Sequence, residues 1–323
     1  MKHPILYLVS VVMGIGLLMC SCSQTSESEE PVPQVEPKND QPVPIVLHYS
    51  LDKAPDTRTA SQTLQTEKLE SSNKAGISII DSINKKTVYA NVRYDVGEDE
   101  TLTPHDADNP PMVSEGQQLT AIAYLPHREE WSDLKEYDFE VQKDQTSDAD
   151  YLASDLIWGK TDSITPENVG KIDLPLTRRL SRWKLDVVLD DHQHIADFRG
   201  AKLAIYGIKR ATKINLANGE VSKEASGALR VITYHSVPDD ATETSQLSGM
   251  LLVPPQTIGS NQCYLRVTFK DGVKLYFAFS PVTFLPKHAY TSTVHLHGYG
   301  LEMTAEIEPF KETVTEGELT SND

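Results

Sequence analysis

The sequence of 323 residues contains only three cysteines, and two of them lie within the first 22 residues. Cys263 is therefore the one cysteine in the body of the chain, which excludes an intramolecular disulfide there. Small domains in oxidising compartments often depend on disulfides, so burial of apolar side chains must hold this fold together. Cys263 alternates with Leu265, Val267 and Phe269. This alternation predicts a core position on a strand rather than a reactive thiol.

Basic residues are also scarce, because 30 Lys and Arg face 47 Asp and Glu, for a net charge of -17. Such a surface is a poor partner for nucleic acid or anionic lipid headgroups. The sequence contains no Gly-rich phosphate loop, nucleophile elbow or His-Glu-x-x-His motif. The carboxylates are too numerous for spacing to single out a pair suited to glycoside hydrolysis. We therefore expect no catalytic residues and no cofactor, and we favour a structural or binding protein over an enzyme.

No stretch keeps a helical apolar period over three turns, so we expect an all-β fold with strands in two groups. That pattern predicts two β-sandwiches. The segment from Thr212 to Gly227 is poor in apolar residues and contains the turn signal Asn218-Gly219. We therefore place an N-terminal sandwich at residues 43–214 and a C-terminal sandwich at residues 215–323. The predicted strands are 45–51, 75–80, 87–94, 119–126, 172–176, 180–189 and 202–208, then 228–234, 249–253, 263–269, 273–279, 291–296 and 301–307.

Two histidine pairs, His192 with His194 and His295 with His297, could each place two metal ligands on one face of a strand. A catalytic zinc site needs three protein ligands, and nothing nearby in the sequence completes either set. We therefore expect no metal site. Val294 and Leu296 are expected to point inward, which sends His295 and His297 to the solvent.

The three tryptophans, Trp131, Trp158 and Trp183, together with the 13 tyrosines, allow two interpretations. They could form a carbohydrate-stacking surface, or they could pack in the core, which is the more frequent use of such residues and the one we favour.

The N-terminus reads as a signal peptide over residues 1–21. Lys2 precedes an apolar run from Ile5 to Met19, which is shorter than the roughly 20 residues of a membrane-spanning helix. The end of this run resembles a bacterial lipobox, and Cys22, with Ser21 before it, fits the acylated position better than Cys20. An ordinary secretory signal is the alternative. Residues 22–42 are rich in Ser, Glu, Pro and Gln and are expected to form a flexible linker.

The first predicted strand places Ile45, Leu47, Tyr49 and Leu51 on one face. The following stretch, residues 52–73, is polar and mostly without periodicity, and it contains Arg58. Such a segment is accessible to proteases. A strand separated from its sandwich by a cleavable segment is unusual.

Several separated motifs, in their order and spacing, resemble the fimbrillin-type pilins and Mfa-like fimbrial lipoproteins of Bacteroidales. They lie at residues 57–59, 89–94, 121–126, 155–159, 174–182, 252–257 and 300–303. The resemblance implies two tandem transthyretin-like β-sandwiches, and a lipoprotein precursor anchored through Cys22 at the surface of the outer membrane. It also implies fimbriae that assemble from subunits by donor-strand exchange. An Arg-directed protease, for which Arg58 matches the cleavage position, would remove the strand that carries Ile45, Leu47, Tyr49 and Leu51.

The C-terminal tail departs from this pattern. The segment from Lys311 to Asp323 is acidic and carries only Val314 and Leu319 as sizeable apolar residues, so it is a poor donor strand. This favours an accessory or tip subunit, although a donor strand at Leu301 to Ile307 would reverse the inference. A tethered surface lipoprotein that binds glycans on a host or bacterial surface is the alternative function.

Overall fold

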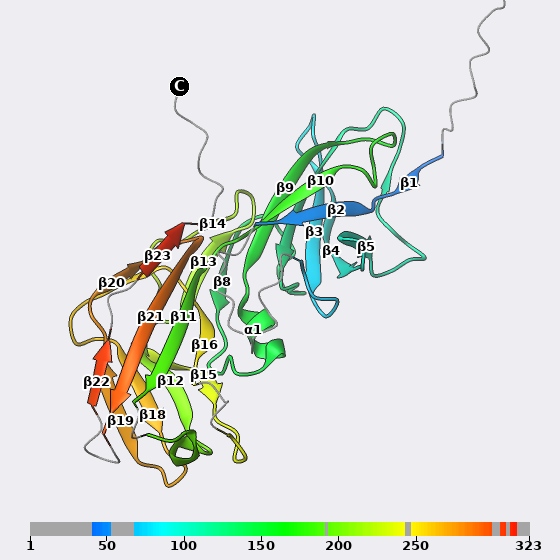
Figure 1. The fold of residues 1–323 in the computed structure, drawn as a ribbon. Coiled ribbons are helices and arrows are strands. Elements are labelled where there is room, and N and C mark those ends of the chain that lie inside the picture. Colours follow the sequence, from blue (N-terminus) through cyan, green and yellow to red (C-terminus); the bar gives the residue numbers. More distant parts are fainter. Residues whose placement is uncertain are drawn as a thin grey trace, which may run out of the picture. The chain divides into compact units, whose positions relative to one another are not determined.

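The computed structural model describes residues 41–52, 68–190, 193–242, 247–298, 304–307 and 311–314. In this part of the chain the helical elements are one short helix, α1 (Asp148–Ser154), and one 3-10 turn (Ile195–Phe198), and the other regular elements are strands (Figure 1). The all-β fold class predicted from the sequence is confirmed.

The N-terminal group of strands forms a closed barrel. Its hydrogen-bonded order returns to its starting strand, because β9 pairs with β10. A short pair lies beside it, in which β1 (Val43–Pro44) is antiparallel to β6 (Met112–Val113). The barrel strands in spatial order are β10 (Asp173–Arg178), β2 (Leu47–Leu51), β5 (Thr101–Pro104), β4 (Thr87–Val96), β3 (Lys74–Asp81), β7 (Leu119–Leu125) and β9 (Ile157–Ile164).

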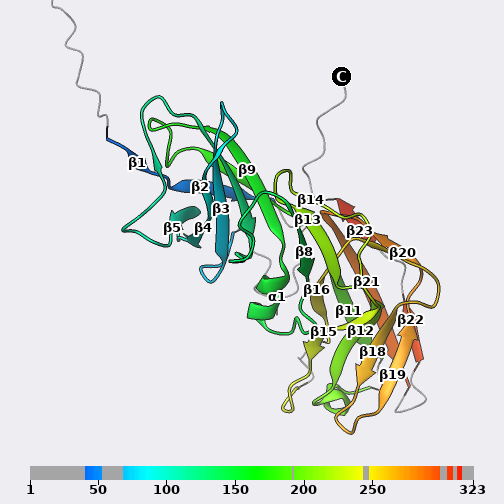
Figure 2. The same ribbon diagram turned by 180° about the vertical axis from the view of Figure 1, so that it is seen from behind.

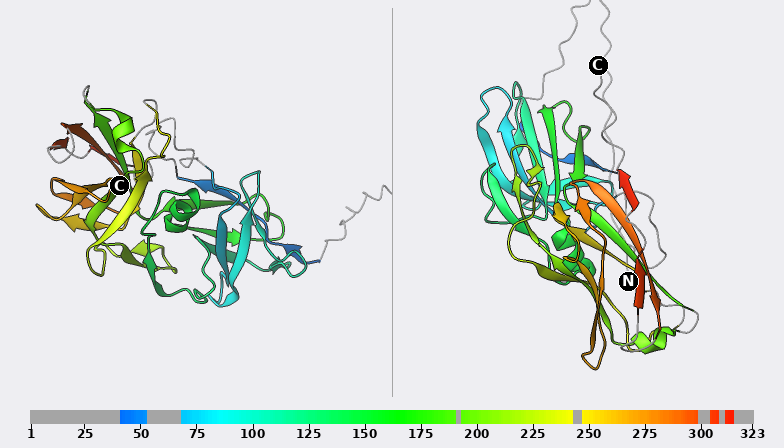
Figure 3. Two further views of the ribbon diagram at one scale, coloured as in Figure 1. Left: turned by 90° about the horizontal axis from the view of Figure 1, so that it is seen from below. Right: turned by 90° about the vertical axis from the view of Figure 1, so that its left-hand side faces the viewer.

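The C-terminal group contains two larger sheets, which can be followed from other sides in Figure 2 and Figure 3. One sheet has the order β16 (Gly249–Val253), β11 (Ser181–Leu189), β21 (His288–His297) and β22 (Thr304–Ile307), and β23 (Lys311–Val314) also pairs with β21. The other sheet has the order β15 (Arg230–Ser236), β12 (Lys202–Ile208), β18 (Tyr264–Thr268) and β19 (Lys274–Ala278).

Two small sheets complete the described fold. One is β14 (Glu220–Val221), β13 (Ala211–Asn215) and β8 (Glu136–Glu140), and the other is β17 (Gln256–Ile258) with β20 (Val282–Phe284).

The strand pairings place the boundary between the two groups of strands earlier in the sequence than predicted. A boundary at 214/215 assigns residues 181–189 and 202–208 to the N-terminal sandwich. In the structure β11 pairs with β16 and β21, and β12 pairs with β15 and β18, so both belong to the C-terminal sheets. The turn-rich segment from Thr212 to Gly227 misled the prediction because it contains most of β13 and all of β14, and it follows β11 and β12 rather than preceding them.

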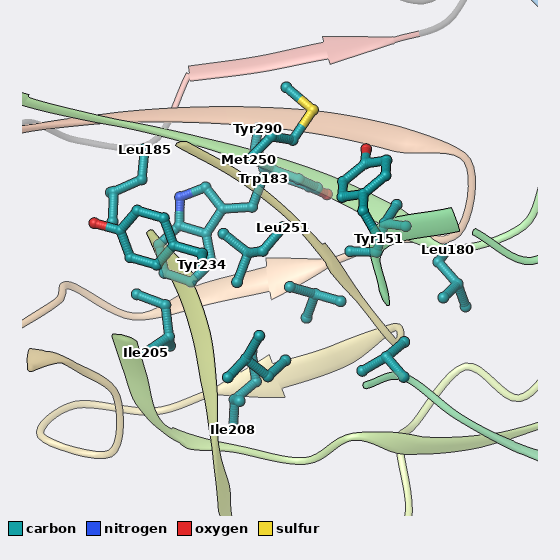
Figure 4. Packing of buried hydrophobic residues seen from close by; sticks show 14 of the residues in the cluster. Tyr151, Leu180, Trp183, Leu185, Ile205, Ile208, Tyr234, Met250, Leu251 and Tyr290 are labelled. Atoms are coloured by element: carbon teal, nitrogen blue, oxygen red, sulfur yellow. The ribbon is translucent and has the colours of Figure 1, made fainter. Parts of the chain in front are cut away.

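The core of the C-terminal sheets is built around Trp183 on β11 (Figure 4). Its indole is fully buried, lies 4.9 Å from the ring of Phe279, and donates a hydrogen bond from Nε1 to Ser292 Oγ at 2.9 Å. Cys263 is buried directly before β18, beside Leu265 and Val267, as the alternation predicts. Burial raises the pKa of its thiol to about 12.

Candidate functional site: the first strand and its place in the barrel

The first strand of the barrel in sequence order is β2, which contains most of the first predicted strand. It is an integral member of the N-terminal barrel and is drawn in blue in Figure 1. It runs parallel to β10 on one side, with Leu174 opposite Tyr49 and Leu176 opposite Leu51, and antiparallel to β5 on the other. We call the place that β2 occupies between β5 and β10 the β2 slot. Without β2, both neighbours would lose a hydrogen-bonded partner and the barrel would be open.

Further backbone hydrogen bonds fix the segment before and along β2. Ile45 N donates to Pro111 O at 2.8 Å, Tyr49 N donates to Glu100 O at 2.9 Å, and Gly170 N donates to Val46 O at 3.0 Å. The Tyr94 hydroxyl donates to Ile45 O at 3.0 Å, and burial raises the pKa of this hydroxyl. The segment is therefore held by main-chain hydrogen bonds of the same kind as those that hold the other strands of the barrel.

The four side chains predicted to face inward do so. Ile45 and Leu47 have exposed fractions of 0%, Tyr49 of 3% and Leu51 of 9%. Full burial of one such side chain contributes about 1.5–3 kcal/mol, so the four together contribute about 6–12 kcal/mol. That range is comparable to the whole stability of a typical domain, about 5–15 kcal/mol. A barrel that lost this strand would therefore either unfold or take up another strand.

The hydroxyl of Tyr49 marks one pocket of the slot as partly polar. Leu69 N donates to Tyr49 Oη at 3.1 Å, and burial raises the pKa of this hydroxyl. Leu69 lies just after residues 53–67, so β2 also binds the chain at the start of the next described segment, residues 68–190.

The end of β2 carries a buried charge. Asp52 follows Leu51 directly, and its Oδ1 accepts a hydrogen bond from Arg178 N at 3.2 Å and lies 3.5 Å from Arg178 Nη1. Arg178 Nε donates to Asp155 Oδ2 at 3.0 Å. Burial raises the pKa of Asp52, against the opposing effect of Arg178. Burial acts to lower the pKa of Arg178, but Asp155 and Asp52 raise it above its usual value.

The sequence matches the fimbrillin-like family over residues 57–314, which is most of its length. The chain belongs to the fimbrillin-like family. Membership supports a role as a subunit of cell-surface fimbriae. No curated protein matches the sequence.

Solved structures of Bacteroides proteins share the fold of this fimbrillin-like chain. A candidate cell adhesion protein from Bacteroides ovatus has a TM-score of 0.64 at 12% identity, over 86% of this chain and 100% of that one. A candidate cell adhesion protein from Bacteroides uniformis has a TM-score of 0.58 at 18% identity, over 82% and 97%. A third, from Bacteroides fragilis, has a TM-score of 0.53 at 14% identity, over 85% and 98%.

Two predicted sites of the fimbrillin-like chain lie outside the described residues. Cys22 falls within residues 1–40, and Arg58 falls within residues 53–67. Lipidation and cleavage at these residues therefore stay predictions.

The sequence did not reveal the contact between Asp52 and Arg178. An acidic residue directly after four alternating apolar positions was a usable signal, because it falls where a strand leaves a barrel. Arg178 gave no such signal, since a cluster of Arg178, Arg179 and Arg182 normally indicates an exposed surface. In the structure all three arginines are buried.

Among the described residues, no group of three or more His, Cys, Asp and Glu side chains is arranged to hold a metal ion. Val294 and Leu296 are fully buried, as predicted, while His295 is half-buried and His297 is exposed. In the same part of the chain, no helix combines the length and apolar character of a membrane span.

The aromatic residues divide between core and surface. All three tryptophans are buried, which confirms their predicted use in packing. Three tyrosines of neighbouring strands instead cluster on one sheet face: Tyr206 and Tyr276 are 44% and 48% exposed, and Tyr264 is half-buried on β18, the strand between theirs. Their ring centroids are 5.8–6.4 Å apart. No pattern in the sequence separates these three from the other tyrosines.

Proposed function

We propose that this chain is a structural subunit of a cell-surface fimbria that assembles by strand exchange. The observation that carries the proposal is β2 itself: it fills a complete place in the barrel, yet a polar segment containing Arg58 connects it to the rest of the chain. Cleavage at Arg58 would free β2, and an extended strand of another subunit would take over its backbone pairing and its four apolar pockets. The subunit would thereby contribute to adhesion.

The precursor is proposed to be a lipoprotein of the outer membrane, anchored through acylated Cys22. Two acyl chains suffice for stable anchoring. An accessory or tip position is favoured by the acidic end of the chain. Lys311–Val314 pairs with β21 as β23, and Thr304–Ile307 pairs with the same strand as β22. Either segment would have to leave β21 in order to act as a donor strand, so the proposed subunit mainly accepts.

Limited digestion of the folded chain with an arginine-specific protease tests the proposal. We expect the first cut after Arg58, a core that begins at Thr59, and oligomers of that core with partner subunits in light scattering after gel filtration. Arg58→Ala is the matched control, and it should resist the cut and stay monomeric. A spared Arg58, or a trimmed core that stays monomeric with each partner subunit tested, would contradict strand exchange.

Carbohydrate binding is a second candidate function, and the exposed cluster of Tyr206, Tyr264 and Tyr276 favours it, because tyrosine rings present both an apolar face and a hydroxyl to a sugar. The rings are tilted against one another by 49°, 79° and 86°, so they form an angled surface rather than a flat one. Titration of a broad glycan panel against the chain and against Tyr276→Ala would decide. Binding that Tyr276→Ala abolishes would support this candidate, and no binding across the panel would remove it.

A further inference from the structure

A cluster of buried charges closes the end of the β2 slot. The side chains of Arg178, Asp52 and Asp155 are 8%, 12% and 5% exposed. Arg179 and Arg182 are also buried, and both lie near enough to interact electrostatically with Asp52. The cluster thus contains three guanidinium groups and two carboxylates.

Cleavage at Arg58 would divide this cluster unequally. Asp52 is its only member that precedes Arg58 in the sequence, so loss of the first strand would remove one carboxylate and no arginine. Three guanidinium groups would then face Asp155 alone. While the slot is open, water can solvate them. A new strand without an acidic residue would bury them again with one carboxylate fewer than in the uncut chain, and burying a charge without its partner is strongly unfavourable.

The backbone geometry fixes where the missing carboxylate must return. Asp52 N donates to Leu176 O at 3.0 Å, and Asp52 Oδ1 accepts from Arg178 N at 3.2 Å, so this residue ends the pairing between β2 and β10. A strand that runs parallel to β10 in the register of β2 brings the residue after its fourth apolar side chain to this point. A strand in the opposite direction would put its fourth apolar side chain in the pocket of Ile45 and the following residue at the exposed position of Pro44, at the other end of the slot from Arg178.

We propose that the β2 slot selects its incoming strand by a carboxylate, and that Arg178 binds it. The partner is an extended segment of another fimbrial subunit, with four apolar side chains at alternate positions and an Asp or Glu directly after the fourth. This proposal rests on the strand exchange proposed above. Arg178 thereby fixes both the direction and the register of the new strand, whereas the four apolar pockets alone would accept a strand shifted by two residues.

Peptide competition on the full chain tests this selection. The chain is cut once at a specific protease site inserted between residues 53 and 67, and the labelled peptide of residues 41–53, amidated at its C-terminus, is exchanged into the slot. Two unlabelled competitors are compared with the native peptide: Asp52→Asn, and Asp52→Asn combined with Gln41→Asp, which restores the net charge at an exposed position. We expect both to bind about tenfold more weakly, because a neutral amide replaces the carboxylate that is paired with the buried Arg178 guanidinium.

The outcomes separate this proposal from strand exchange itself. Equal binding of all three peptides would overturn selection by Arg178 and leave strand exchange standing. Recovery of affinity by Gln41→Asp would also overturn it, since net charge and not position would then matter. If not even the native peptide entered the slot, strand exchange would fail, and the selection rule with it.

Discussion

Individual buried side chains give the fold its sensitivity to pH. His235 on β15 is largely enclosed, and its Nε2 has no hydrogen-bond partner among the described residues. Burial lowers the pKa of this imidazole, and it does the same for His127, where Arg93 adds to the effect. Both rings are therefore kept neutral in the folded chain at a pH where the unfolded chain begins to bind protons.

The sign of the resulting pH dependence follows from the lowered pKa. The stabilising effect is complete above the ordinary histidine pKa of about 6.5 and is lost as the pH falls below it, because the unfolded state then binds more protons. We expect the free energy of unfolding of His235→Gln to depend less on pH between pH 7 and pH 5 than that of the native chain, in urea titrations. A slope for His235→Gln equal to that of the native chain would contradict this assignment.

Among the elements, β12 depends on a glycine at its bulge. Gly207 has φ of +91°, and its position falls at the register shift between Tyr206 and Ile208. A Cβ atom there would overlap the carbonyl oxygen of Gln262, which belongs to the turn before β18. The bulge therefore brings two backbones closer than any side chain allows.

Gly207→Ala should accordingly lower the free energy of unfolding by about 2–5 kcal/mol, through backbone strain and overpacking together. Gly116→Ala is the matched control, since Gly116 also has positive φ, at +76°, but open space around it. Gly116→Ala should lower the free energy of unfolding by only about 1–2 kcal/mol. Chemical denaturation of both variants measures the difference. Similar losses in the free energy of unfolding for both variants would show that the close approach of Gly207 to Gln262 does not add to the cost of the substitution.

The sequence predicted most individual elements because their periodicity is local. Alternation placed Ile45, Leu47, Tyr49 and Leu51 on one buried face. Asp271-Gly272, the strongest hairpin signal in the sequence, lies in the turn that joins β18 and β19. Segments without such a pattern were missed or left open. Residues 150–158, for which the sequence allows either a strand or a helical turn, contain most of α1 and the start of β9. Lys311–Val314 pairs with β21 although its sequence carries a single sizeable apolar residue.

At the scale of the whole molecule, the pairing of distant strands could not be predicted from the sequence. The parallel contact between β2 and β10 joins residues more than a hundred positions apart, and no local signal specifies which strand closes the barrel. For the same reason, the ion pair of Asp52 with Arg178 could not be predicted, and the predicted boundary between the two groups of strands fell too late in the sequence. Periodicity indicates which face of a strand is buried, but only the three-dimensional structure shows which residues that face packs against.

Strand exchange requires that β2 be a separable part of the barrel whose place another strand can fill. Native mass spectrometry tests this requirement on the chain cut between residues 53 and 67 and incubated with an isotope-labelled peptide of residues 41–53. We expect one labelled peptide to replace one native segment of residues 41–53 while the remaining chain stays folded. A cut chain that never exchanges this segment, or that unfolds irreversibly on losing it, would contradict strand exchange.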